Sequence, residues 1–267
     1  MESNEPLSGI NGVLFDLEGV LYIGTQAIEG AIDALAQIRH CGLPCRFLTN
    51  TSTLSRRSLA VKLTAMGFRI DASEIFSAPW ATRNYLAETP DRSCHFLLAE
   101  ELLPEFADLP QAPIETADII VLGDMGGDWS YALLNQVFRR LMEGARLVAI
   151  HKNRFWQTEE GLRMDIGCFV AGLEYCSGVQ AEVVGKPAPA FFRLALQDMG
   201  RSPSEAVMIG DDLEVDVGGA LKAAVWTVLV KTGKFRPALL DGSSIRPHRV
   251  IDSIRDLPAL LGLVRGR

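Results

Sequence analysis

The chain has 267 residues, of which 48% are hydrophobic and 22% are charged. This composition is ordinary for a globular protein and excludes disorder as the main state. The 26 Lys and Arg residues against 33 Asp and Glu residues give a formal net charge of −7. Because proteins bind nucleic-acid backbones through an excess of Lys and Arg, this balance argues against nucleic acid as a main partner. The length suggests one large domain, or a core domain that carries a smaller one.

Targeting and membrane signals are not evident in the sequence. The longest apolar runs, such as residues 224–230, are far shorter than the ~20 residues that a membrane helix needs. The first ten residues, MESNEPLSGI, show neither a basic stretch nor an apolar stretch of a secretory signal. The five cysteines include no CxxC pair, which favours reduced, structural thiols over a metal or redox site. We therefore expect a cytoplasmic protein without a membrane partner.

In the first part of the chain, short apolar runs alternate with segments of helical periodicity. Ile32, Leu35 and Ile38, for example, recur at helical spacing. Strand–helix alternation of this kind predicts an α/β fold, with a mostly parallel sheet and helices on both faces. The predicted elements are a strand at 12–15, a helix at 29–41, a strand at 45–48 and a helix at 54–66.

The same alternation returns near the C-terminus. Its strands again end close to acidic residues, as the run AVMI at 206–209 does. Because acid-terminated strands occur only in the two outer parts of the chain, we expect these parts to form one core together. The predicted elements here are a helix at 190–199, strands at 206–209, 225–230 and 249–251, and a helix at 254–261.

The segment between these halves has strands and a helix of its own. It could continue one large sheet, but the absence of acid-terminated strands favours an inserted domain. We therefore predict a core made of residues 1–83 and 181–267, and an inserted domain at 84–180. Within the insertion we expect strands at 95–99, 119–122 and 146–150, and a helix at 131–142.

Reactive polar residues recur where predicted strands end. In an open parallel sheet, ligands bind beyond the carboxyl ends of the strands. Each of these residues alone has a structural explanation as a turn residue, a helix cap or a solvated side chain, but four such segments in chain order favour a shared site. They are Asp16 and Glu18 in FDLEGVLY, Thr49 and Asn50 in FLTNTS, Lys186 in VVGKPAP, and Asp211, Asp212 and Asp216 in IGDDLEVD.

Together these side chains predict a site for a cation and a phosphoryl group. Clustered carboxylates repel one another unless a hard divalent cation such as Mg²⁺ lies among them, since Mg²⁺ prefers oxygen ligands. A cation, a lysine and the polar donors of Thr49 and Asn50 would all favour a multiply charged anion. Phosphoryl transfer needs mainly positioning and charge neutralisation, and a carboxylate can accept the phosphoryl group covalently.

In this order, the four segments resemble the four motifs of the haloacid dehalogenase (HAD) superfamily. The inserted segment resembles, by its placement, the large α/β (C2-type) cap of the subfamily that includes NagD and the p-nitrophenyl phosphatases. More narrowly, TEEGLRMDIGCFVAGLEYCSGVQAEVVGKPAPAFF and VLVKTGKFR are similar to the branch of phospholysine phosphohistidine inorganic pyrophosphate phosphatases and HAD-like hydrolase domain-containing protein 2. The resemblance spans about residues 10–262. It implies a Rossmann-like core with an inserted cap, and Mg²⁺-dependent hydrolysis of a small phosphorylated molecule.

The resemblance also implies which residues carry the reaction. Asp16 would be the nucleophile that forms an aspartyl-phosphate, and it would share a metal ion with Asp211. The residue two positions further, Glu18, would protonate the leaving group and then activate water, while its backbone carbonyl binds the metal.

Four further roles follow from the same motifs. Thr49 would donate a hydrogen bond to the phosphoryl oxygens, and Asn50 would help to place them. Lys186 would neutralise charge between the nucleophile and the phosphate. Asp212 and Asp216 would hold metal-bound waters or Lys186.

Position 18 departs from the superfamily pattern, because most phosphatases of the superfamily have Asp there. Glu can also act as an acid and base, but its extra methylene moves the carboxyl group by roughly 1 Å, which can cost on the order of 100-fold in rate. We therefore predict a slow phosphatase. Two alternatives remain: a binding or regulatory protein of the same fold that has lost useful turnover, and another reaction of the same intermediate, such as transfer to an acceptor other than water or dehalogenation. The acidic cluster argues against dehalogenation, which needs no Mg²⁺.

Substrate choice is expected to depend on the inserted domain, because a small phosphoryl site cannot distinguish leaving groups. Two loops contain polar residues that could meet an anionic substrate, although a solvated loop is the plainer interpretation of both. Relatives with this cap often pair through it, so the resemblance also predicts a homodimer. The loop residues are Asp124 and Met125 in LGDMGGDW, and His151, Lys152, Asn153 and Arg154 in AIHKNRFW.

Overall fold

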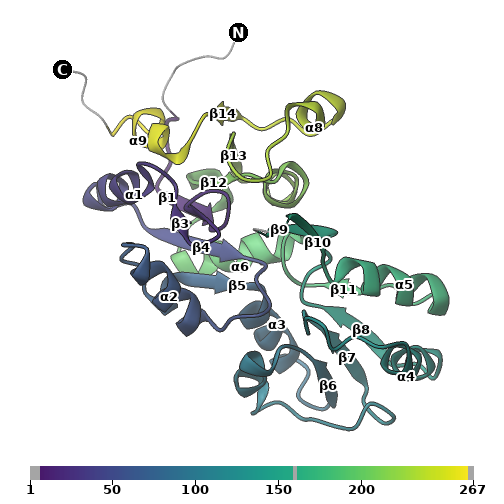
Figure 1. Cartoon of the computed structure of the whole chain (residues 1–267). Coiled ribbons are helices and arrows are strands. Elements are labelled where there is room, and N and C mark those ends of the chain that lie inside the picture. The colour runs from purple at the N-terminus through teal and green to yellow at the C-terminus, as the bar shows by residue number, and fades with distance from the viewer. Residues whose placement is uncertain (1–6, 159–160, 264–267) are drawn as a thin grey trace. The chain divides into compact units, whose positions relative to one another are not determined.

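The computed structural model describes residues 7–158 and 161–263, which divide into two compact units (Figure 1). The first unit runs up to Thr49 and continues with Ala60–Phe76 and with the chain from Lys186 onward; the second contains Asn50–Leu59 and Ser77–Gly185. Each unit has its own parallel sheet, so the predicted α/β fold is confirmed. Within the described ranges, no helix combines the length and the apolar character needed to cross a bilayer.

A six-stranded parallel sheet forms the centre of the first unit. Its strands are apolar runs, and β1, for example, is buried along its whole length. Such continuous apolar runs are typical of parallel strands that are covered on both faces. In spatial order the strands are β14 (Arg249–Ile251), β13 (Trp226–Val230), β12 (Ala206–Gly210), β1 (Gly12–Asp16), β4 (Cys45–Thr49) and β5 (Ile75–Ser77).

The strand order of this sheet reverses beside β1. From β1 the chain adds β4 and β5 on one side, and it later adds β12, β13 and β14 on the other. The register aligns Asp16 with Leu48 of β4, and its neighbour Phe15 with Ile209 of β12. The carboxyl ends of β1 and β12 therefore lie side by side at the switch point of the sheet, where α/β proteins bind ligands.

The second unit is built on a four-stranded parallel sheet. Its core consists of buried apolar residues from the strands, such as Ile120 and Leu147, packed with residues of the neighbouring helices, such as Val137 and Val170. Helix α4 begins after Ser130, whose hydroxyl accepts a hydrogen bond from the backbone N–H of Leu133 at 3.2 Å. In spatial order the strands are β11 (Glu182–Val183), β8 (Arg146–Ala149), β7 (Ile119–Leu122) and β6 (Cys94–Leu97).

The remaining elements connect and cover these sheets. Two antiparallel pairs are small: β2 (Tyr22–Ile23) with β3 (Gln26–Ala27), and β9 (Phe155–Thr158) with β10 (Gly161–Met164). The helices are α1 (Ala31–His40), α2 (Arg56–Ala65), α3 (Ala78–Ala87), α4 (Tyr131–Met142), α5 (Gly167–Ser177), α6 (Pro189–Met199), α7 (Gly219–Lys222), α8 (Pro237–Gly242) and α9 (Leu257–Leu260). A short 3₁₀ turn, Ile254–Asp256, precedes α9 where the sequence predicts one continuous helix.

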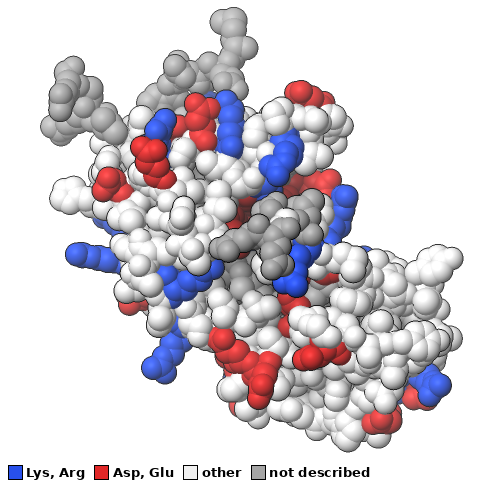
Figure 2. All heavy atoms as spheres, in the orientation of Figure 1, with Lys and Arg blue, Asp and Glu red and all other residues white. Residues whose placement is uncertain are grey.

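Charged side chains are mixed on the surface. In Figure 2, Lys and Arg side chains are interspersed with Asp and Glu side chains. On the described part of this face, no continuous basic stripe of the kind that follows a nucleic-acid backbone is visible.

Candidate active site

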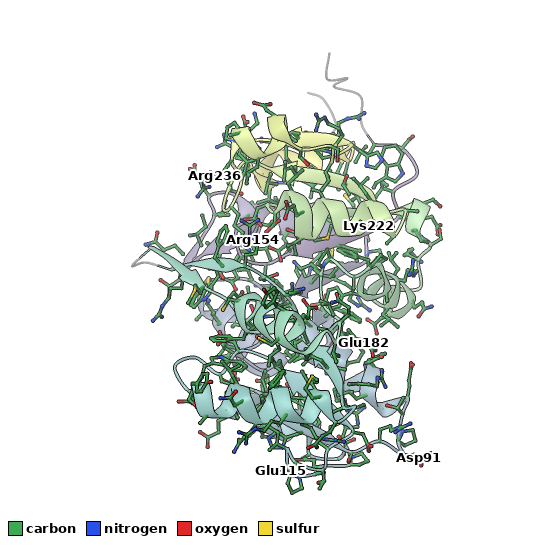
Figure 3. All side chains as sticks on the ribbon, turned by 90° about the vertical axis from the view of Figure 1, so that its right-hand side faces the viewer. Asp91, Glu115, Arg154, Glu182, Lys222 and Arg236 are labelled. Atoms are coloured by element: carbon green, nitrogen blue, oxygen red, sulfur yellow. The ribbon has the colours of Figure 1, made fainter. Side chains whose placement is uncertain are left out.

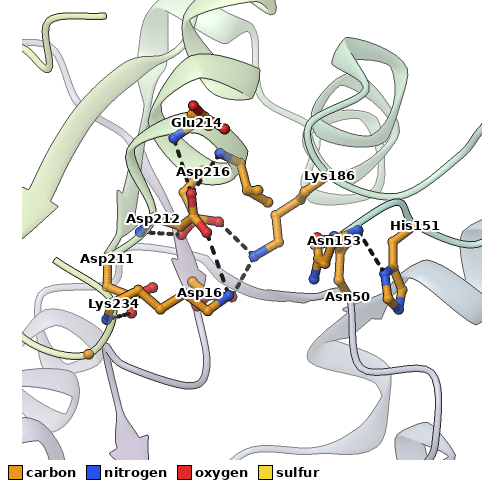
Figure 4. Close-up of polar contacts among 12 residues, drawn as sticks. Asp16, Asn50, His151, Asn153, Lys186, Asp211, Asp212, Glu214, Asp216 and Lys234 are labelled. Carbon is orange, nitrogen blue, oxygen red and sulfur yellow. Dashed lines mark hydrogen bonds and ion pairs between the residues drawn. The ribbon is translucent and has the colours of Figure 1, made fainter. Parts of the chain in front are cut away.

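A cluster of three buried carboxylates lies at the switch point of the six-stranded sheet (Figure 4). Asp16 is the last residue of β1, Asp211 directly follows β12, and Asp216 belongs to a π-helical turn, Leu213–Gly218. One oxygen of each carboxylate lies within 4.8 Å of the corresponding oxygens of the other two. The three residues are only 8%, 2% and 1% exposed, respectively. Buried charges at this spacing require a compensating partner.

Lys186 provides one such partner. Its Nζ donates to Asp16 Oδ1 and, over 2.7 Å, to Asp216 Oδ1, and the side chain is buried. Burial alone would lower the pKa of Lys186, but the charges of Asp16 and Asp216 and their hydrogen bonds outweigh it and raise the pKa. Lys186 therefore stays charged at neutral pH between the first and the last carboxylate of the cluster.

Two of the three carboxylates, Asp211 and Asp216, remain electrostatically destabilised even with Lys186 present. Burial raises the pKa of Asp211 well above its ordinary value, and the nearby charges of Asp16 and Asp216 raise it further. Burial likewise raises the pKa of Asp216, while the charge of Lys186 offsets part of this effect. One lysine thus does not neutralise the cluster, and a further positive charge would relieve it.

Asp212 supports the cluster from the adjoining turn. Its Oδ1 accepts hydrogen bonds from the backbone N–H groups of Glu214, at 3.1 Å, and Val215, at 3.0 Å, and so caps the π-helical turn. Its own backbone N–H donates to Asp216 Oδ2 over 3.2 Å. Asp212 therefore helps to fix the position of Asp216.

Glu18 lies in the turn that follows β1. The backbone N–H of Gly19 donates to the carbonyl of Tyr22 over 2.7 Å, and this turn leaves Glu18 at an exposed position. Surrounding protein atoms still displace part of the water around its carboxyl group, which raises its pKa; the charge of Lys62 offsets part of this rise. The Lys62 ammonium lies 4.5 Å from the centre of the Tyr22 ring.

The two residues of the second motif fall into different units. Thr49 is buried at the carboxyl end of β4, the strand beside β1. Asn50 begins the second unit, where its Nδ2 donates to Asn153 Oδ1 over 3.1 Å. Of the predicted site residues, the first unit therefore brings together Asp16, Lys186, Asp211, Asp212 and Asp216, with Thr49 and Glu18 on adjoining segments.

The loop residues of the second unit are mostly engaged within that unit. His151 is buried, and its Nε2 lies 3.0 Å from Ser52 Oγ. Lys152 pairs with Glu174. Only Arg154, which lies at the base of the β9–β10 hairpin in Figure 3, matches a solvated position. The interpretation of AIHKNRFW as a solvated loop is thus wrong for His151, which is buried, whereas Lys152 is partly exposed and pairs with Glu174.

The donor set of the cluster suits a hard divalent cation. Every candidate ligand atom is a carboxylate oxygen, which is the ligand type that Mg²⁺ selects. Mg²⁺ also keeps several of its waters in protein sites, so carboxylate oxygens within 4.8 Å of one another can surround one ion either directly or through its waters. The cluster is therefore consistent with a divalent metal site.

Sequence reasoning missed one cation of this site. Lys234 follows β13, and its backbone N–H donates to Asp211 Oδ2 over 2.6 Å. Its Nζ lies 3.5 Å from Asp212 Oδ2. The signal was present in the sequence, because Lys234 also follows the carboxyl end of a strand of the same sheet.

Comparison with known proteins identifies the family. A model of haloacid dehalogenase-like hydrolases matches residues 13–109, and a second model, of HAD-hydrolase-like proteins, matches residues 183–257. Among curated proteins, the chain is 39% identical over 263 residues to phospholysine phosphohistidine inorganic pyrophosphate phosphatase of Rattus norvegicus, covering 96% of each chain. It is 40% identical over 246 residues to haloacid dehalogenase-like hydrolase domain-containing protein 2 of Bos taurus, covering 91% of this chain and 93% of the relative.

Solved structures show the same architecture. The p-nitrophenyl phosphatase from Archaeoglobus fulgidus matches 93% of this chain and 98% of its own, with a TM-score of 0.87 and 27% identity. NagD from E. coli K-12 matches 94% of this chain and 99% of its own, with a TM-score of 0.85 and 25% identity. The chain therefore belongs to the haloacid dehalogenase-like hydrolases, and within them to the NagD-like subfamily.

Proposed function

We propose that this protein is a Mg²⁺-dependent phosphatase that hydrolyses a small phosphorylated substrate through an aspartyl-phosphate on Asp16. The observation that carries the proposal is the buried cluster of Asp16, Asp211 and Asp216 with Lys186 at the switch point of the sheet. Three carboxylates and one lysine carry a net negative charge that a divalent cation would neutralise, and the cation together with Lys186 would attract an anionic group. This charge pattern is what phosphoryl transfer needs from a protein.

The metal would be held by Asp16, Asp211 and the backbone carbonyl of Glu18. When bound, Mg²⁺ would supply positive charge that offsets the charge of the phosphoryl group. Asp212 and Asp216 would hold its waters, and Asp216 also holds Lys186 in place through their hydrogen bond.

The first chemical step would form a covalent bond between an Asp16 carboxylate oxygen and phosphorus. The bond between phosphorus and the leaving group breaks, and Glu18 donates a proton to the departing oxygen or nitrogen. The raised pKa of Glu18 favours this role, because it keeps more of the acid protonated. Lys186 and the hydroxyl of Thr49, with Asn50, would stabilise the charge on the phosphoryl oxygens.

The second step would release phosphate. Glu18, now ionised, takes a proton from a water molecule whose oxygen attacks the phosphorus of the aspartyl-phosphate. The bond between phosphorus and the Asp16 oxygen breaks, which returns Asp16 as a carboxylate and Glu18 as an acid. Both residues thus begin the next cycle in their original states.

The substrate is proposed from the names of the relatives. They act on phospholysine, phosphohistidine, pyrophosphate and p-nitrophenyl phosphate, which all contain a phosphoryl group on a small leaving group. We propose that residues 84–180 act as the cap that selects among such leaving groups. A homodimer formed through this cap and a cytoplasmic location are part of the same proposal.

A substrate panel tests the activity directly. Phosphate release would be measured from pyrophosphate, p-nitrophenyl phosphate, phospholysine and phosphohistidine, with Mg²⁺ and with a chelator. The proposal expects release that needs Mg²⁺ and disappears in Asp16→Asn. The matched control is Asp252→Asn, which makes the same substitution at an exposed carboxylate that pairs with Lys231, and this variant should retain activity.

The exposed position of Glu18, together with its unusual length, supports a second candidate function. A glutamate that does not reach the leaving group would leave a protein that binds Mg²⁺ and a phosphorylated ligand with little turnover. No release from any member of the panel, combined with measurable Mg²⁺ binding, would favour this binding protein over the enzyme.

A further inference from the structure

The loop after β13, residues 231–236, reaches the acidic cluster from a side that the four motifs do not cover. The backbone N–H of Lys234 donates to Asp211 Oδ2 over 2.6 Å. The hydroxyl of Thr232 donates to the backbone carbonyl of Gly19. The loop is thus attached both to the carboxylate that follows β12 and to the turn that follows β1.

Two glycines allow this close approach. A Cβ atom at Gly19 or at Gly233 would lie only 2.0 Å from Asp211 Oδ2. Both residues also have positive φ angles, 90° and 59°, which side chains disfavour. The backbone of the loop is therefore shaped to contact Asp211, and the side chain of Lys234 starts from a fixed point beside the cluster.

The ammonium of Lys234 enters the cluster from that point. Its Nζ lies 3.5 Å from Asp212 Oδ2, its side chain is 31% exposed, and in Figure 4 it points towards the carboxylates. When the four carboxylates Asp16, Asp211, Asp212 and Asp216 are ionised, the two lysines at positions 186 and 234 leave two net negative charges. A single divalent cation would neutralise that remainder.

We propose that Lys234 is a positioning residue and built-in counter-charge of the metal site, and that it limits how tightly the site binds a divalent cation. This inference rests on the proposed Mg²⁺-dependent function. The ammonium and the metal would attract the same carboxylates and repel each other, so the lysine weakens metal binding. It also stabilises the cluster while no metal is bound, because part of the repulsion among the carboxylates is already offset.

A plainer interpretation is that Lys234 forms a partly exposed ion pair with Asp212 alone. Such pairs contribute about 0–1 kcal/mol to stability, and removing one would leave metal affinity unchanged or would loosen it. The two interpretations therefore predict different results for one measurement, the Mg²⁺ affinity of a site that lacks the Lys234 charge: tighter binding in the first case, unchanged or weaker binding in the second.

The test is calorimetric titration of the full chain with MgCl₂, without substrate. Lys234→Met removes the charge but retains the backbone N–H that contacts Asp211. We expect it to bind Mg²⁺ about fivefold more tightly than the natural sequence, the effect of one partly exposed charge. Lys234→Arg restores the charge and should bind as the natural sequence does. Lys231→Met is the matched control in the same loop, because Lys231 pairs with Asp252 outside the cluster.

Thermal unfolding gives a second readout. Without metal, Lys234→Met should unfold at a lower temperature than Lys231→Met, and Mg²⁺ should raise its midpoint by more. Equal or weaker Mg²⁺ binding by Lys234→Met than by the natural sequence would overturn the inference while leaving the phosphatase proposal intact. Absence of Mg²⁺ binding by the natural sequence would instead remove the proposed metal-dependent function, and this inference with it.

Discussion

Replacing Asp211 by Asn should stabilise the metal-free protein and abolish its response to Mg²⁺. Burial raises the pKa of Asp211 well above 3.8, and the charges of Asp16 and Asp216 raise it further. An asparagine keeps the shape and removes the charge. Its carbonyl can accept the hydrogen bond from the backbone N–H of Lys234, which leaves its amide to donate towards the neighbouring carboxylates.

The sign of the pH dependence follows from the direction of the pKa shift. Because the folded protein holds the Asp211 proton more tightly than the unfolded chain does, stability falls as the pH rises from the unfolded pKa towards the folded pKa. For a chain of this size, 1 kcal/mol moves the melting temperature by about 2–4 °C. Asp211→Asn should therefore melt measurably higher than the natural sequence at pH 8, because about 1 kcal/mol of relieved repulsion already corresponds to a few degrees.

The assay is thermal unfolding between pH 4 and pH 8, with a chelator or with Mg²⁺. In chelator, the gain of Asp211→Asn should be largest at pH 8 and should shrink towards pH 4, close to the ordinary pKa of 3.8, where the folded protein keeps Asp211 protonated. With Mg²⁺ the natural sequence should gain stability because the ion binds only the folded state, whereas the variant should respond little. Asp252→Asn is the control: the ion pair with Lys231 lowers the pKa of Asp252, so its removal should give no gain.

The reasoning would be refuted by a lower melting temperature of Asp211→Asn in chelator at pH 8. It would be refuted equally by a gain that does not depend on pH, because such a gain could not come from the titration of this carboxylate.

Three further variants test other parts of the site. Glu18→Asp should raise kcat by about 10- to 100-fold in steady-state assays, because it withdraws the carboxyl by ~1 Å to its usual position; an unchanged or lower kcat would contradict this account of position 18. Lys186→Met should cost about 3–5 kcal/mol of unfolding free energy in urea denaturation without metal, because it leaves Asp16 and Asp216 without their buried counter-charge; a loss below about 1 kcal/mol would show that this charge is dispensable. Gly19→Ala places a methyl group 2.0 Å from Asp211 Oδ2 and should weaken Mg²⁺ binding about 10-fold or more by calorimetry, and an unchanged affinity would speak against the close packing of this turn.

Sequence patterns predicted the elements that are both long and regular. The helix predicted at 131–142 and the strand predicted at 119–122 have these same bounds in the structure. Continuous apolar runs bounded by turn residues are typical of buried strands, so they can be predicted from the sequence. The grouping of Asp16, Asp211 and Asp216 could also be predicted, because the carboxyl ends of adjacent parallel strands meet at one edge of the sheet.

Elements that depend on tertiary packing were not predicted from the sequence. Helix α5 contains Gly167 and Gly172 and lacks a clear polar face, so local propensity does not favour it. It forms because residues such as Val170 and Leu173 pack on the four-stranded sheet. In the same way, the sequence shows Thr49 and Asn50 as adjacent donors, but only the three-dimensional packing reveals that the boundary between the compact units falls between them.

Lys234 shows what cannot be predicted from the position of polar residues at the ends of strands. The rule that polar residues at carboxyl ends form the site applies to Lys234 as well as to Asp211, because both follow strands of one sheet. Its contact with Asp211, however, depends on the backbone shape of Gly19 and Gly233. A sequence pattern shows which residues can reach an edge of a sheet, but it does not show which backbone amide will contact which carboxylate there.

Part of the surplus of acidic residues lies in one buried cluster. The net charge of −7 includes the carboxylates of Asp16, Asp211 and Asp216, which are buried together. If Asp211→Asn is more stable without metal and also unable to respond to Mg²⁺, then Asp211 lowers the stability of the metal-free protein and is needed for the binding of the ion. Such a result would mean that stability alone favours removal of that carboxylate, and metal binding would then explain why the buried cluster contains it. The same measurement thus tests both the electrostatics of the cluster and the reason for the cluster.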